Sequence, residues 1–476
     1  MWHQLTDLLA EATARAPQST ALIAGEDRYT VSYAELTRRT EELGAILLRN
    51  GLRRGDVVAV QGRNSVEFVV ALLAAVGAGM VVAPLDPALP EAETRRRLDL
   101  VGARTTLIGG ELSSPPREAT APVGLSADDA LVMLTSGTTG VPKIVPWTHQ
   151  SLAAGVAGVV AAYHLTAADS TVAVMPLFHG HGLVATLLAT LTSGGAVLLP
   201  ARGNFTAHTF WDDMAAARAT WFTAVPTIHR ILLHRSAPGQ PDAERVFPAL
   251  RFVRTCSAPL SPELAQQLES RFKAVVLAAY GTTETTHQAS TVRPGDVEAV
   301  RLHTVGTPAV LTVRIADPDG KEARAGDFGE IWLKGPTVTR GYLGPEPADP
   351  FTDGWLRTGD LGLVDLDGNL TVTGRIKNLI NRGGEKISPE HVEEVLTGYP
   401  GVRQAAVVGV PDALYGERVA AAVVAEGSVD TQTLVEFCRT RLAAFEIPEV
   451  VTLVSEVPLT AKGDVDRKAL ATLLTR

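Results

Sequence analysis

The chain has 476 residues, of which 46% are hydrophobic and 20% are charged, and its formal net charge is −9. This length exceeds one ordinary core and predicts a globular protein of two or more domains, while the acidic balance argues against a general nucleic-acid or anionic-membrane binder. With only Cys256 and Cys438, a disulfide framework or a cysteine-based zinc site is excluded. No signal peptide or membrane-spanning run is visible, so we expect a cytoplasmic protein.

The N-terminal part alternates expected strands with expected helices. Ser32-Tyr33-Ala34-Glu35 is a capping box that begins a helix running to about Leu48. A helix over 65–77 lies between strands over 57–60 and 81–84. The alternation then continues with strands over 171–175, 196–199, 221–224, 252–254 and 275–279, and with helices over 151–163, 183–192, 210–218, 227–234 and 262–272. Such alternation predicts parallel sheets of the α/β class.

The pattern changes after Val292. The segments 310–315 and 329–334 alternate apolar and polar residues around a turn at 318–320, which predicts a small antiparallel, barrel-like subdomain. After Arg375 the chain reads helix, strand, strand, helix, strand. We therefore expect an α/β fold with a large N-terminal domain of stacked βαβ sheets and a β-barrel-like subdomain, residues 1–376, and a small α+β C-terminal domain, residues 377–476.

The stretch Thr135-Ser136-Gly137-Thr138-Thr139-Gly140-Val141-Pro142-Lys143 follows an apolar run of strand length. Its glycines and proline forbid a regular element, so backbone N–H groups and hydroxyls are free to meet phosphate oxygens, and Lys143 adds a positive charge. The Walker A spacing is absent. This composition predicts a polyphosphate cradle, and the alternative is a polar surface turn.

Three further motifs follow in order: Tyr280-Gly281-Thr282-Thr283-Glu284, then Gly354-Trp355-Leu356-Arg357-Thr358-Gly359-Asp360, then Gly374-Arg375-Ile376-Lys377. Together with the glycine-rich loop they resemble the core motifs of the adenylate-forming superfamily, which includes acyl-CoA synthetases, luciferases and peptide-synthetase adenylation domains. The resemblance runs from about Tyr29 to Leu470. It implies an AMP-forming ligase that uses ATP, Mg²⁺ and CoA and releases pyrophosphate.

Chemistry and resemblance together assign the nucleotide site. Glu284 is a hard oxygen ligand that suits Mg²⁺, with Thr138 as a second candidate, and Tyr280 can stack on adenine or be an ordinary core tyrosine. Asp360 offers two acceptors to a ribose diol. The resemblance adds Thr283 on the α-phosphate and Arg375 on ribose or phosphate. It also adds the neighbouring nucleotide contacts Gly281, Thr282, Ser257, Ala258 and Pro259.

Two features concern the C-terminal domain. The resemblance makes Lys377 the hinge around which a mobile C-terminal domain rotates between the two half-reactions, and the alternative is a simple exposed lysine. The family's catalytic lysine near the C-terminus is replaced by Asp464. Lys462, two residues earlier on an expected extended strand, faces the same way and is the candidate substitute. The alternative is that the role is lost and adenylation is slow.

The segments 175–183, 211–214, 219–229 and 381–389 closely resemble the oxalate–CoA ligases of plants and fungi. In that subgroup the residue matching His287 helps to hold a small dicarboxylate, and His181 and Ser257 match other contacts. His229 completes the set of substrate candidates, although His179 and His229 could instead be packed structural residues. The alternatives are activation of another small oxyanion, such as nitrite for diazotisation of an aromatic amine, or a catalytically weak ATP- or AMP-binding protein. We expect no nucleic-acid or membrane partner.

Overall fold

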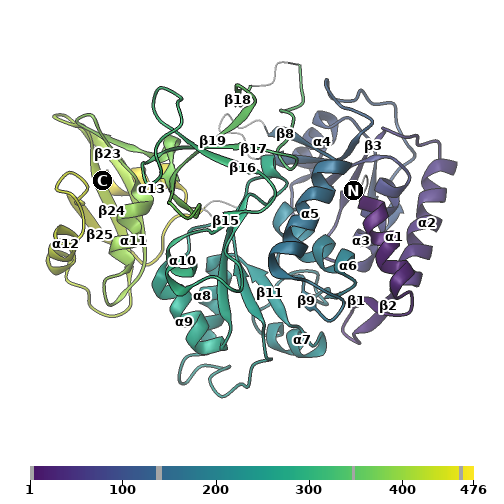
Figure 1. Cartoon of the computed structure of the whole chain (residues 1–476), viewed down its shortest axis with the longest axis horizontal. Helices are drawn as coiled ribbons and strands as arrows, with labels where there is room; N and C mark the ends of the chain where they lie inside the picture. The colour runs from purple at the N-terminus through teal and green to yellow at the C-terminus, as the bar shows by residue number, and fades with distance from the viewer. Residues whose placement is uncertain (1–4, 136–141, 346–348, 460–464, 476) are drawn as a thin grey trace. The chain divides into compact units, whose positions relative to one another are not determined.

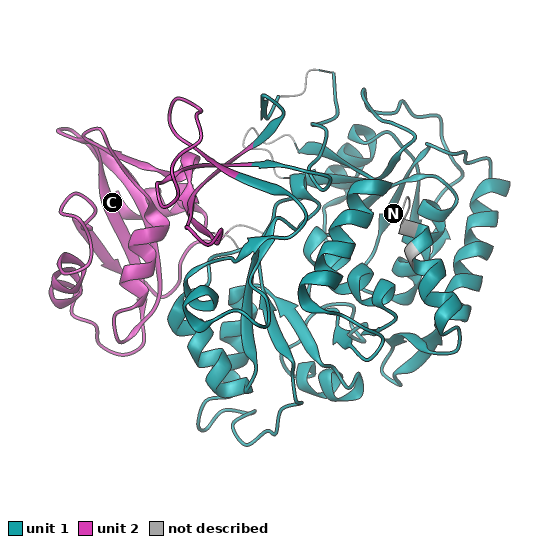
Figure 2. Ribbon diagram, viewed as in Figure 1, with its two compact units in different colours: residues 1–313, 333–356 teal, residues 314–332, 357–476 magenta. Residues whose placement is uncertain are grey.

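The computed structural model describes residues 5–135, 142–345, 349–459 and 465–475 (Figure 1). The chain divides into two compact units, shown in Figure 2. Unit 1 comprises residues 1–313 and 333–356, and unit 2 comprises residues 314–332 and 357–476. Unit 2 thus starts earlier in the sequence than the expected boundary, and the hinge at Lys377 stays a prediction. No helix of the described ranges is both long and apolar enough to cross a membrane.

One sheet of unit 1 carries the glycine-rich loop and has the strand order β6-β5-β3-β4-β7-β8. Its middle strands are parallel, and β6 and β8 run antiparallel to their neighbours. The bounds are β3 (Val57–Gln61), β4 (Val81–Leu85), β5 (Ala103–Ile108), β6 (Glu111–Leu112), β7 (Asp129–Thr135) and β8 (Lys143–Thr148). Neither β5 nor β6 was predicted from the sequence.

The helices of this region are α2 (Tyr33–Arg49), α3 (Val66–Gly77) and α4 (Glu91–Leu100). The Ser32 hydroxyl caps α2 by accepting from the backbone N–H of Glu35, as its capping box predicts. Helix α3 is apolar on almost every face and is buried on almost every face, with Glu67 as an exposed exception. It packs against α2 and against the strands β3 and β4.

A second sheet of unit 1 has the order β2-β1-β10-β9, in which β1, β10 and β9 are parallel. Helices α1, α5 and α6 pack against one another beside it (Figure 1). The bounds are α1 (Leu5–Arg15), β1 (Thr20–Ala24), β2 (Tyr29–Ser32), α5 (His149–Tyr163), β9 (Ser170–Val172), α6 (Ala189–Ser193) and β10 (Ala196–Leu198). One continuous apolar core joins this sheet to the β3–β4–β7 region.

Two expected elements differ here from the sequence analysis. The strand expected to reach residue 175 stops at Val172, because the buried Asn64 amide donates to the carbonyls of Ala173 (2.9 Å) and Met175 (3.0 Å). A side chain thus serves as the partner of these two carbonyls, while the Ala173 N–H still donates to the carbonyl of Leu198 in β10. The helix expected over 183–192 begins earlier, as the π-helix η1 (His181–Leu188), and continues as α6. A π-turn is wider than an α-turn and is frequent at functional sites.

The third sheet of unit 1 has the order β11-β12-β13-β14-β15, and β11, β12 and β13 are parallel and in register. An aromatic-rich core that includes Trp211 and Phe222 lies between this sheet and its helices. The bounds are α7 (Phe210–Ala216), β11 (Trp221–Ala224), α8 (Pro226–Arg235), β12 (Phe252–Thr255), α9 (Pro262–Phe272), β13 (Val275–Tyr280), η2 (Thr283–Thr285), β14 (Ser290–Thr291), α10 (Glu298–His303) and β15 (Thr307–Pro308).

The antiparallel subdomain expected after Val292 is present as the order β16-β17-β19-β18, with β20 paired to β19. The bounds are β16 (Thr312–Ala316), β17 (Gly329–Lys334), β18 (Phe351–Thr352), β19 (Trp355–Val364) and β20 (Leu370–Arg375). A Cβ on Gly329 would lie 2.2 Å from the carbonyl oxygen of Ala316. Only glycine therefore allows β17 to approach β16 at that point.

The C-terminal part of unit 2 has the sheet order β22-β21-β24-β23, with β25 parallel to β24. It has its own apolar core, centred on the long β23–β24 hairpin. The bounds are η3 (Ile376–Asn378), β21 (Ile380–Arg382), β22 (Glu385–Ile387), α11 (Pro389–Thr397), β23 (Val402–Asp412), β24 (Gly416–Ala425), α12 (Thr431–Arg439), β25 (Val450–Leu453) and α13 (Arg467–Leu474). The β21–β22 hairpin and α13 were not predicted from the sequence.

Candidate active site

The glycine-rich loop connects two antiparallel strands of unit 1. Thr135 is the last residue of β7, Lys143 is the first residue of β8, and the two are cross-strand partners. The residues between them that were assigned to the phosphate cradle, Ser136, Gly137, Thr138, Thr139 and Gly140, lie outside the described residues. The metal candidate Thr138 is among these.

Lys143 and Glu284 are joined through a tyrosine that the sequence analysis did not select. The Tyr342 hydroxyl donates to Glu284 Oε1 at 2.8 Å, and the Lys143 ammonium donates to the same hydroxyl at 3.3 Å. The ammonium also lies 4.3 Å from the centroid of the Tyr342 ring. Burial and the adjacent Glu284 carboxylate raise the pKa of Tyr342, so its phenol stays protonated and acts as the donor. The structure therefore brings the loop lysine and the candidate metal ligand together.

The backbone around Glu284 is held by residues from distant parts of unit 1. The Trp147 indole donates to the carbonyl of Thr283 at 2.7 Å, and the N–H of Thr339 donates to the carbonyl of Glu284 at 2.7 Å. Thr282 caps the short helix η2, and its N–H donates to the hydroxyl of Thr285 at 2.9 Å. These contacts fix the direction in which the Glu284 side chain leaves the chain.

Tyr280 and Gly281 occupy the carboxyl end of β13. Tyr280 is 9% exposed, and a Cβ on Gly281 would lie 2.5 Å from the carbonyl oxygen of His287. The chain can therefore fold back on itself here only because residue 281 has no side chain. In doubly wound folds ligands bind at the carboxyl ends of parallel strands, and Ser257 follows β12 at this same edge of the sheet.

Glu284 is the described residue that fits Mg²⁺. Groups of three or more His, Cys, Asp or Glu side chains that could hold a metal do not occur among the residues that the structure describes. Mg²⁺ does not need such a cage, because it is commonly bound by one or two carboxylates together with phosphate oxygens and waters. One oxygen of Glu284 accepts from Tyr342. The carboxylate has further lone pairs for a metal ion.

His181, Ser257 and His287 meet in one cluster, which we call the acid chamber. The His181 and His287 rings stack with centroids 5.0 Å apart, and the Ser257 hydroxyl lies 3.2 Å from His181 Nδ1. Both histidines are buried, whereas Ser257, Ala258 and Pro259 are exposed. The cluster therefore runs from the protein interior to an accessible strand end.

The acid chamber is tightly packed at Gly180, and its backbone is unusual. A Cβ on Gly180 would lie 2.9 Å from the Trp147 ring and 3.0 Å from the His287 Cβ. Ser257 (φ +75°), Thr286 (φ +52°) and His287 (φ +63°) all have left-handed backbone conformations. Such conformations are costly for residues with side chains and gather at functional sites.

Both imidazoles of the chamber are held in the neutral form. Burial lowers the pKa of His287 to about 3, with the Arg254 charge and His179 acting in the same direction. Burial, His287 and Arg254 together hold the pKa of His181 well below its usual range. The Nε2 atom of His287 is buried without a hydrogen-bond partner among the described residues. A neutral imidazole with an uncommitted nitrogen can bind an acceptor atom of a ligand.

The other two histidines behave differently. His229 is fully buried and its ring lies against Phe222, with centroids 5.5 Å apart. Burial lowers its pKa to about 4, and the backbones of Arg254 and Ala224 act in the opposite direction. This is the packed environment that the sequence analysis gave as the alternative for His229. His179, for which the same alternative was given, is instead exposed.

The sequence analysis missed the most deeply buried charge of this region, Arg254. Its side chain is fully buried on β12, and its guanidinium donates to Tyr163, Thr223 and Gln288 and approaches His181. The signal was present, because an arginine inside the apolar run Phe252-Val253-Arg254-Thr255 interrupts a buried-strand pattern. Tyr342 offered no comparable signal.

The site candidates of unit 2 form a pair. Asp360 on β19 and Arg375 on β20 are cross-strand partners, and their side chains form an ion pair with Nε–Oδ1 at 2.6 Å. Asp360 is 2% exposed, while the Arg375 side chain is 50% exposed. Lys377 lies in the short helix η3 and is exposed. Lys462 and Asp464 lie outside the described residues.

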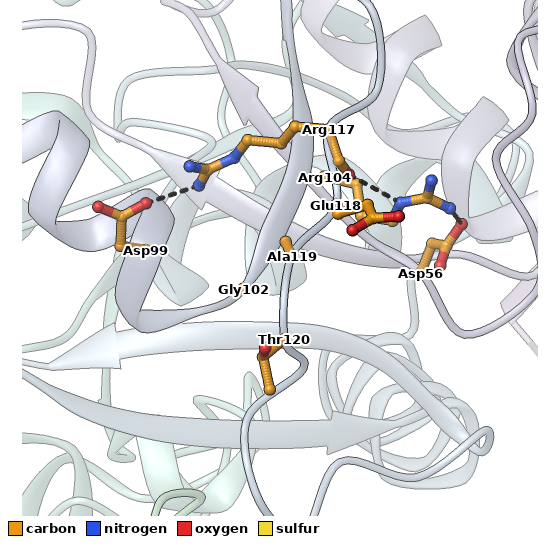
Figure 3. Close-up of a pocket in the computed structure, with 8 residues that line it drawn as sticks. All are labelled: Asp56, Asp99, Gly102, Arg104, Arg117, Glu118, Ala119 and Thr120. Carbon is orange, nitrogen blue, oxygen red and sulfur yellow. Dashed lines mark hydrogen bonds and ion pairs between the residues drawn. The ribbon is translucent and has the colours of Figure 1, made fainter.

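A surface hollow of unit 1, drawn in Figure 3, lies apart from all of these residues. Its arginines are committed to aspartates, Arg104 to Asp56 at 2.6 Å and Arg117 to Asp99 at 2.7 Å. A Cβ on Gly102 would lie 2.2 Å from the carbonyl oxygen of Thr120, so a close backbone approach shapes the hollow. The arrangement is that of ion-paired surface structure.

Comparison with family models finds two matches. Residues 9–124 and 111–343 match the AMP-binding enzyme model, and residues 391–464 match the model of the C-terminal domain of AMP-binding enzymes. These ranges include the glycine-rich loop, the acid chamber and Tyr342.

Similar proteins of known activity and a solved structure extend these matches. The chain is 39% identical to an oxalate–CoA ligase of Arabidopsis thaliana, covering 98% of both chains. It is 34% identical to a sulfoacetate–CoA ligase of Cupriavidus necator, covering 99% of this chain and 98% of the relative. The structure is similar to ATP-bound MatB from Rhodopseudomonas palustris, with a TM-score of 0.87, 29% identity and 99% of both chains covered.

Proposed function

Since the chain belongs to the AMP-binding enzyme family, we propose that it activates a small dianionic acid of the oxalate kind with ATP and transfers the acyl group to CoA. The family-level chemistry is that of an AMP-forming ligase. The choice of acid goes further and rests on the acid chamber. Two relatives named above, an oxalate and a sulfoacetate ligase, act on small acids that carry two negative groups.

The observation that supports this choice is the stacked pair of buried, neutral imidazoles. His181 and His287 present nitrogen atoms instead of an apolar wall, and His287 Nε2 has no protein partner among the described residues. A fatty or aromatic acid would leave His287 Nε2 unpaired, at a cost of about 1–3 kcal/mol. A second carboxylate satisfies it. The close packing of Trp147 and His287 around Gly180 leaves little room there, which favours a short acid.

The proposed first step joins two anions. A carboxylate oxygen of the acid forms a bond to the α-phosphorus of ATP, the bond from that phosphorus to the bridging oxygen breaks, and pyrophosphate leaves. Lys143 and the loop that begins at Thr135 would hold the departing phosphates, and Thr283 would contact the α-phosphate. Glu284 would bind Mg²⁺, whose charge offsets the repulsion between carboxylate and phosphates.

In the proposed second step the sulfur of CoA bonds to the acyl carbon and AMP leaves. Tyr280, with Gly281, Thr282, Ala258 and Pro259 beside it, would bind the adenine in both steps. Asp360 is proposed for the ribose hydroxyls and its partner Arg375 for ribose or phosphate. Lys377 is proposed as the hinge of the C-terminal domain. Lys462 and Asp464 keep the two alternatives that the sequence leaves open.

Pyrophosphate release with a panel of acids tests the proposal. We expect oxalate to give the highest kcat/KM, longer dicarboxylates to follow, and acetate and fatty acids to be poor. With CoA, mass spectrometry should find the acyl thioester and AMP in equal amounts. Turnover with long monocarboxylates but not with oxalate would remove the small-dianion assignment.

Two other outcomes of the panel have defined meanings. Nitrite-dependent pyrophosphate release without oxalate turnover would favour activation of an inorganic oxyanion. Nucleotide binding with no turnover on any acid would favour the weak-binding alternative. Because Glu284→Ala removes the proposed metal ligand, it serves as the blank for background hydrolysis in every assay.

A further inference from the structure

Arg254 is a positive charge buried without an acidic partner. Its side chain has no exposed surface, and its polar neighbours among the described residues are the hydroxyls of Tyr163 and Thr223, the Gln288 amide oxygen, the His181 ring and the Cys256 sulfur. Among the described residues, no aspartate or glutamate forms an ion pair with it. Arg235, a largely buried arginine of the same unit, does have one, since it pairs with Asp242 at 2.9 Å.

An unpaired buried charge needs an explanation, because desolvating it costs several kcal/mol unless an opposite charge or strong hydrogen bonds offset the cost. Neutral hydroxyl and amide oxygens offset only part of this cost. A folded protein that retains such a charge gains nothing in stability from it. The missing negative charge is therefore expected on a molecule that binds nearby.

A chain of hydrogen bonds leads from Arg254 to the accessible end of the acid chamber. Arg254 Nη1 donates to the Thr223 hydroxyl at 3.1 Å, and that oxygen lies 2.6 Å from His181 Nε2. Since a guanidinium can only donate, the Thr223 hydroxyl accepts from Arg254 and donates its own hydrogen to His181 Nε2. His181 Nε2 is then the acceptor of its ring and Nδ1 carries the hydrogen.

The chain ends at Ser257. The Nδ1–H of His181 donates to the Ser257 hydroxyl, 3.2 Å away, which leaves the hydroxyl hydrogen of the exposed Ser257 for a ligand. A second branch runs through Gln288, whose Oε1 accepts from Arg254 Nη2 at 3.1 Å. Its Nε2 is buried without a partner among the described residues. Both branches end in donors.

We propose that Arg254 is a positioning residue that selects dianionic over monoanionic acids: its charge is balanced by the non-reacting carboxylate of the substrate and acts through Thr223, His181 and Ser257. The inference rests on the proposed function, since it concerns the second charge of the same acid. Hydrogen bonds in such a chain polarise one another in the same direction, so the buried charge strengthens the final donor. The guanidinium does not need to touch the acid.

The test compares oxalate with glycolate, in which a neutral hydroxymethyl group replaces one carboxylate. Arg254→Met removes the charge, and Thr223→Val removes the hydroxyl that transmits it but keeps the charge. Arg235→Met is the matched control, because it removes an arginine whose charge is already paired within the protein. For each protein we would measure KM for oxalate, glycolate and ATP, and the rise in Tm that saturating oxalate causes.

We expect Arg254→Met to raise KM for oxalate about tenfold to hundredfold, as for the loss of charged hydrogen bonds, and to abolish the oxalate-induced rise in Tm. KM for glycolate and for ATP should change less than about threefold. Thr223→Val should shift the oxalate KM in the same direction by up to about tenfold. Arg235→Met should lower Tm and leave the oxalate-to-glycolate ratio unchanged.

Equal rises in KM for oxalate and glycolate in Arg254→Met, or an unchanged ratio in both variants, would overturn the inference. If Arg254→Met does not fold, the decision passes to Thr223→Val, which alters no charge. The proposed function fails separately, because in that case the wild-type protein itself would show no oxalate turnover.

Discussion

The cluster of Lys143, Tyr342 and Glu284 lies in the same unit as the acid chamber, but the two regions carry charge in opposite ways. Lys143 and Glu284 carry their charges on side chains that are at least partly exposed, and both side chains form a hydrogen bond with the Tyr342 hydroxyl. The acid chamber is lined by neutral imidazoles, and its single described cation, Arg254, lies behind them with no exposed surface. Solvated charges adapt at little cost to phosphates that move and leave. Fixed, buried donors instead discriminate, because a wrong ligand leaves them unpaired.

The largest effect is expected from removing the negative charge of Glu284. Glu284→Ala should lower kcat/KM for adenylation by at least about a hundredfold, because charge stabilisation where the two anions meet would be lost. Single-turnover pyrophosphate release measures the effect, and an unchanged Tm would show that the fold persists. Wild-type activity in this variant would remove Glu284 from the metal-binding role.

Removing a donor from the acid chamber should have a smaller and more selective effect. His287→Ala is expected to raise KM for oxalate about tenfold to hundredfold while KM for ATP stays nearly unchanged. Steady-state kinetics with each substrate varied in turn provides the measurement. Equal increases in both constants would mean that the variant damages the whole site, and the contrast between the two regions would disappear.

The link between Lys143 and Glu284 should matter least among the substitutions. Tyr342→Phe keeps the ring beneath the ammonium and removes only the hydroxyl, so we expect a loss in kcat/KM of less than about tenfold. Titration of activity with Mg²⁺ checks whether the metal affinity changes. A loss as large as that of Glu284→Ala would show that the cluster of Lys143, Tyr342 and Glu284 is as rigidly preorganised as the acid chamber.

Acidification should have almost no effect on binding of the acid. The pKa values of His181 and His287 lie below the ordinary histidine range, so both rings stay neutral as the pH falls from 8 to 6. KM for oxalate should therefore change less than about twofold over this pH range. For comparison, a shift of one unit in pKa corresponds to a difference of about 1.4 kcal/mol between the two protonation states. In the unfolded chain the same histidines take up protons near pH 6.5, so folding stability should decrease below that pH. An inflection of KM near pH 6.5 would contradict the neutral chamber.

The elements predicted correctly were those whose own residues carry the signal. The apolar strands and the capped helix at Ser32 were found because the residues of each element themselves show its burial or its cap. Helix α4 was not found, because none of its residues is fully buried and only Leu98 and Leu100 pack against an apolar core. Surface pairs such as Glu91–Arg95 and Glu93–Arg97 add to its support.

The same rule applies to the site. Motifs located Lys143, Glu284 and His287, but not the tyrosine between the first two, because Tyr342 is 58 residues from its partner Glu284. Long-range contacts of this kind leave no periodic trace in the sequence. Arg254 is an intermediate case, since its position in an apolar strand was anomalous although its partners were not visible.

Trp147 sets a practical limit on redesigning substrate range. Its indole nitrogen holds the carbonyl of Thr283, next to the candidate metal ligand, while its ring edge faces Gly180 at the acid chamber. One rigid, fully buried side chain therefore contacts both the loop at Thr283 and the acid chamber. Replacing Trp147 by a smaller residue to admit a bulkier acid would also remove the hydrogen bond that holds the loop at Thr283. Such a variant would accept a broader range of acids but would lose turnover.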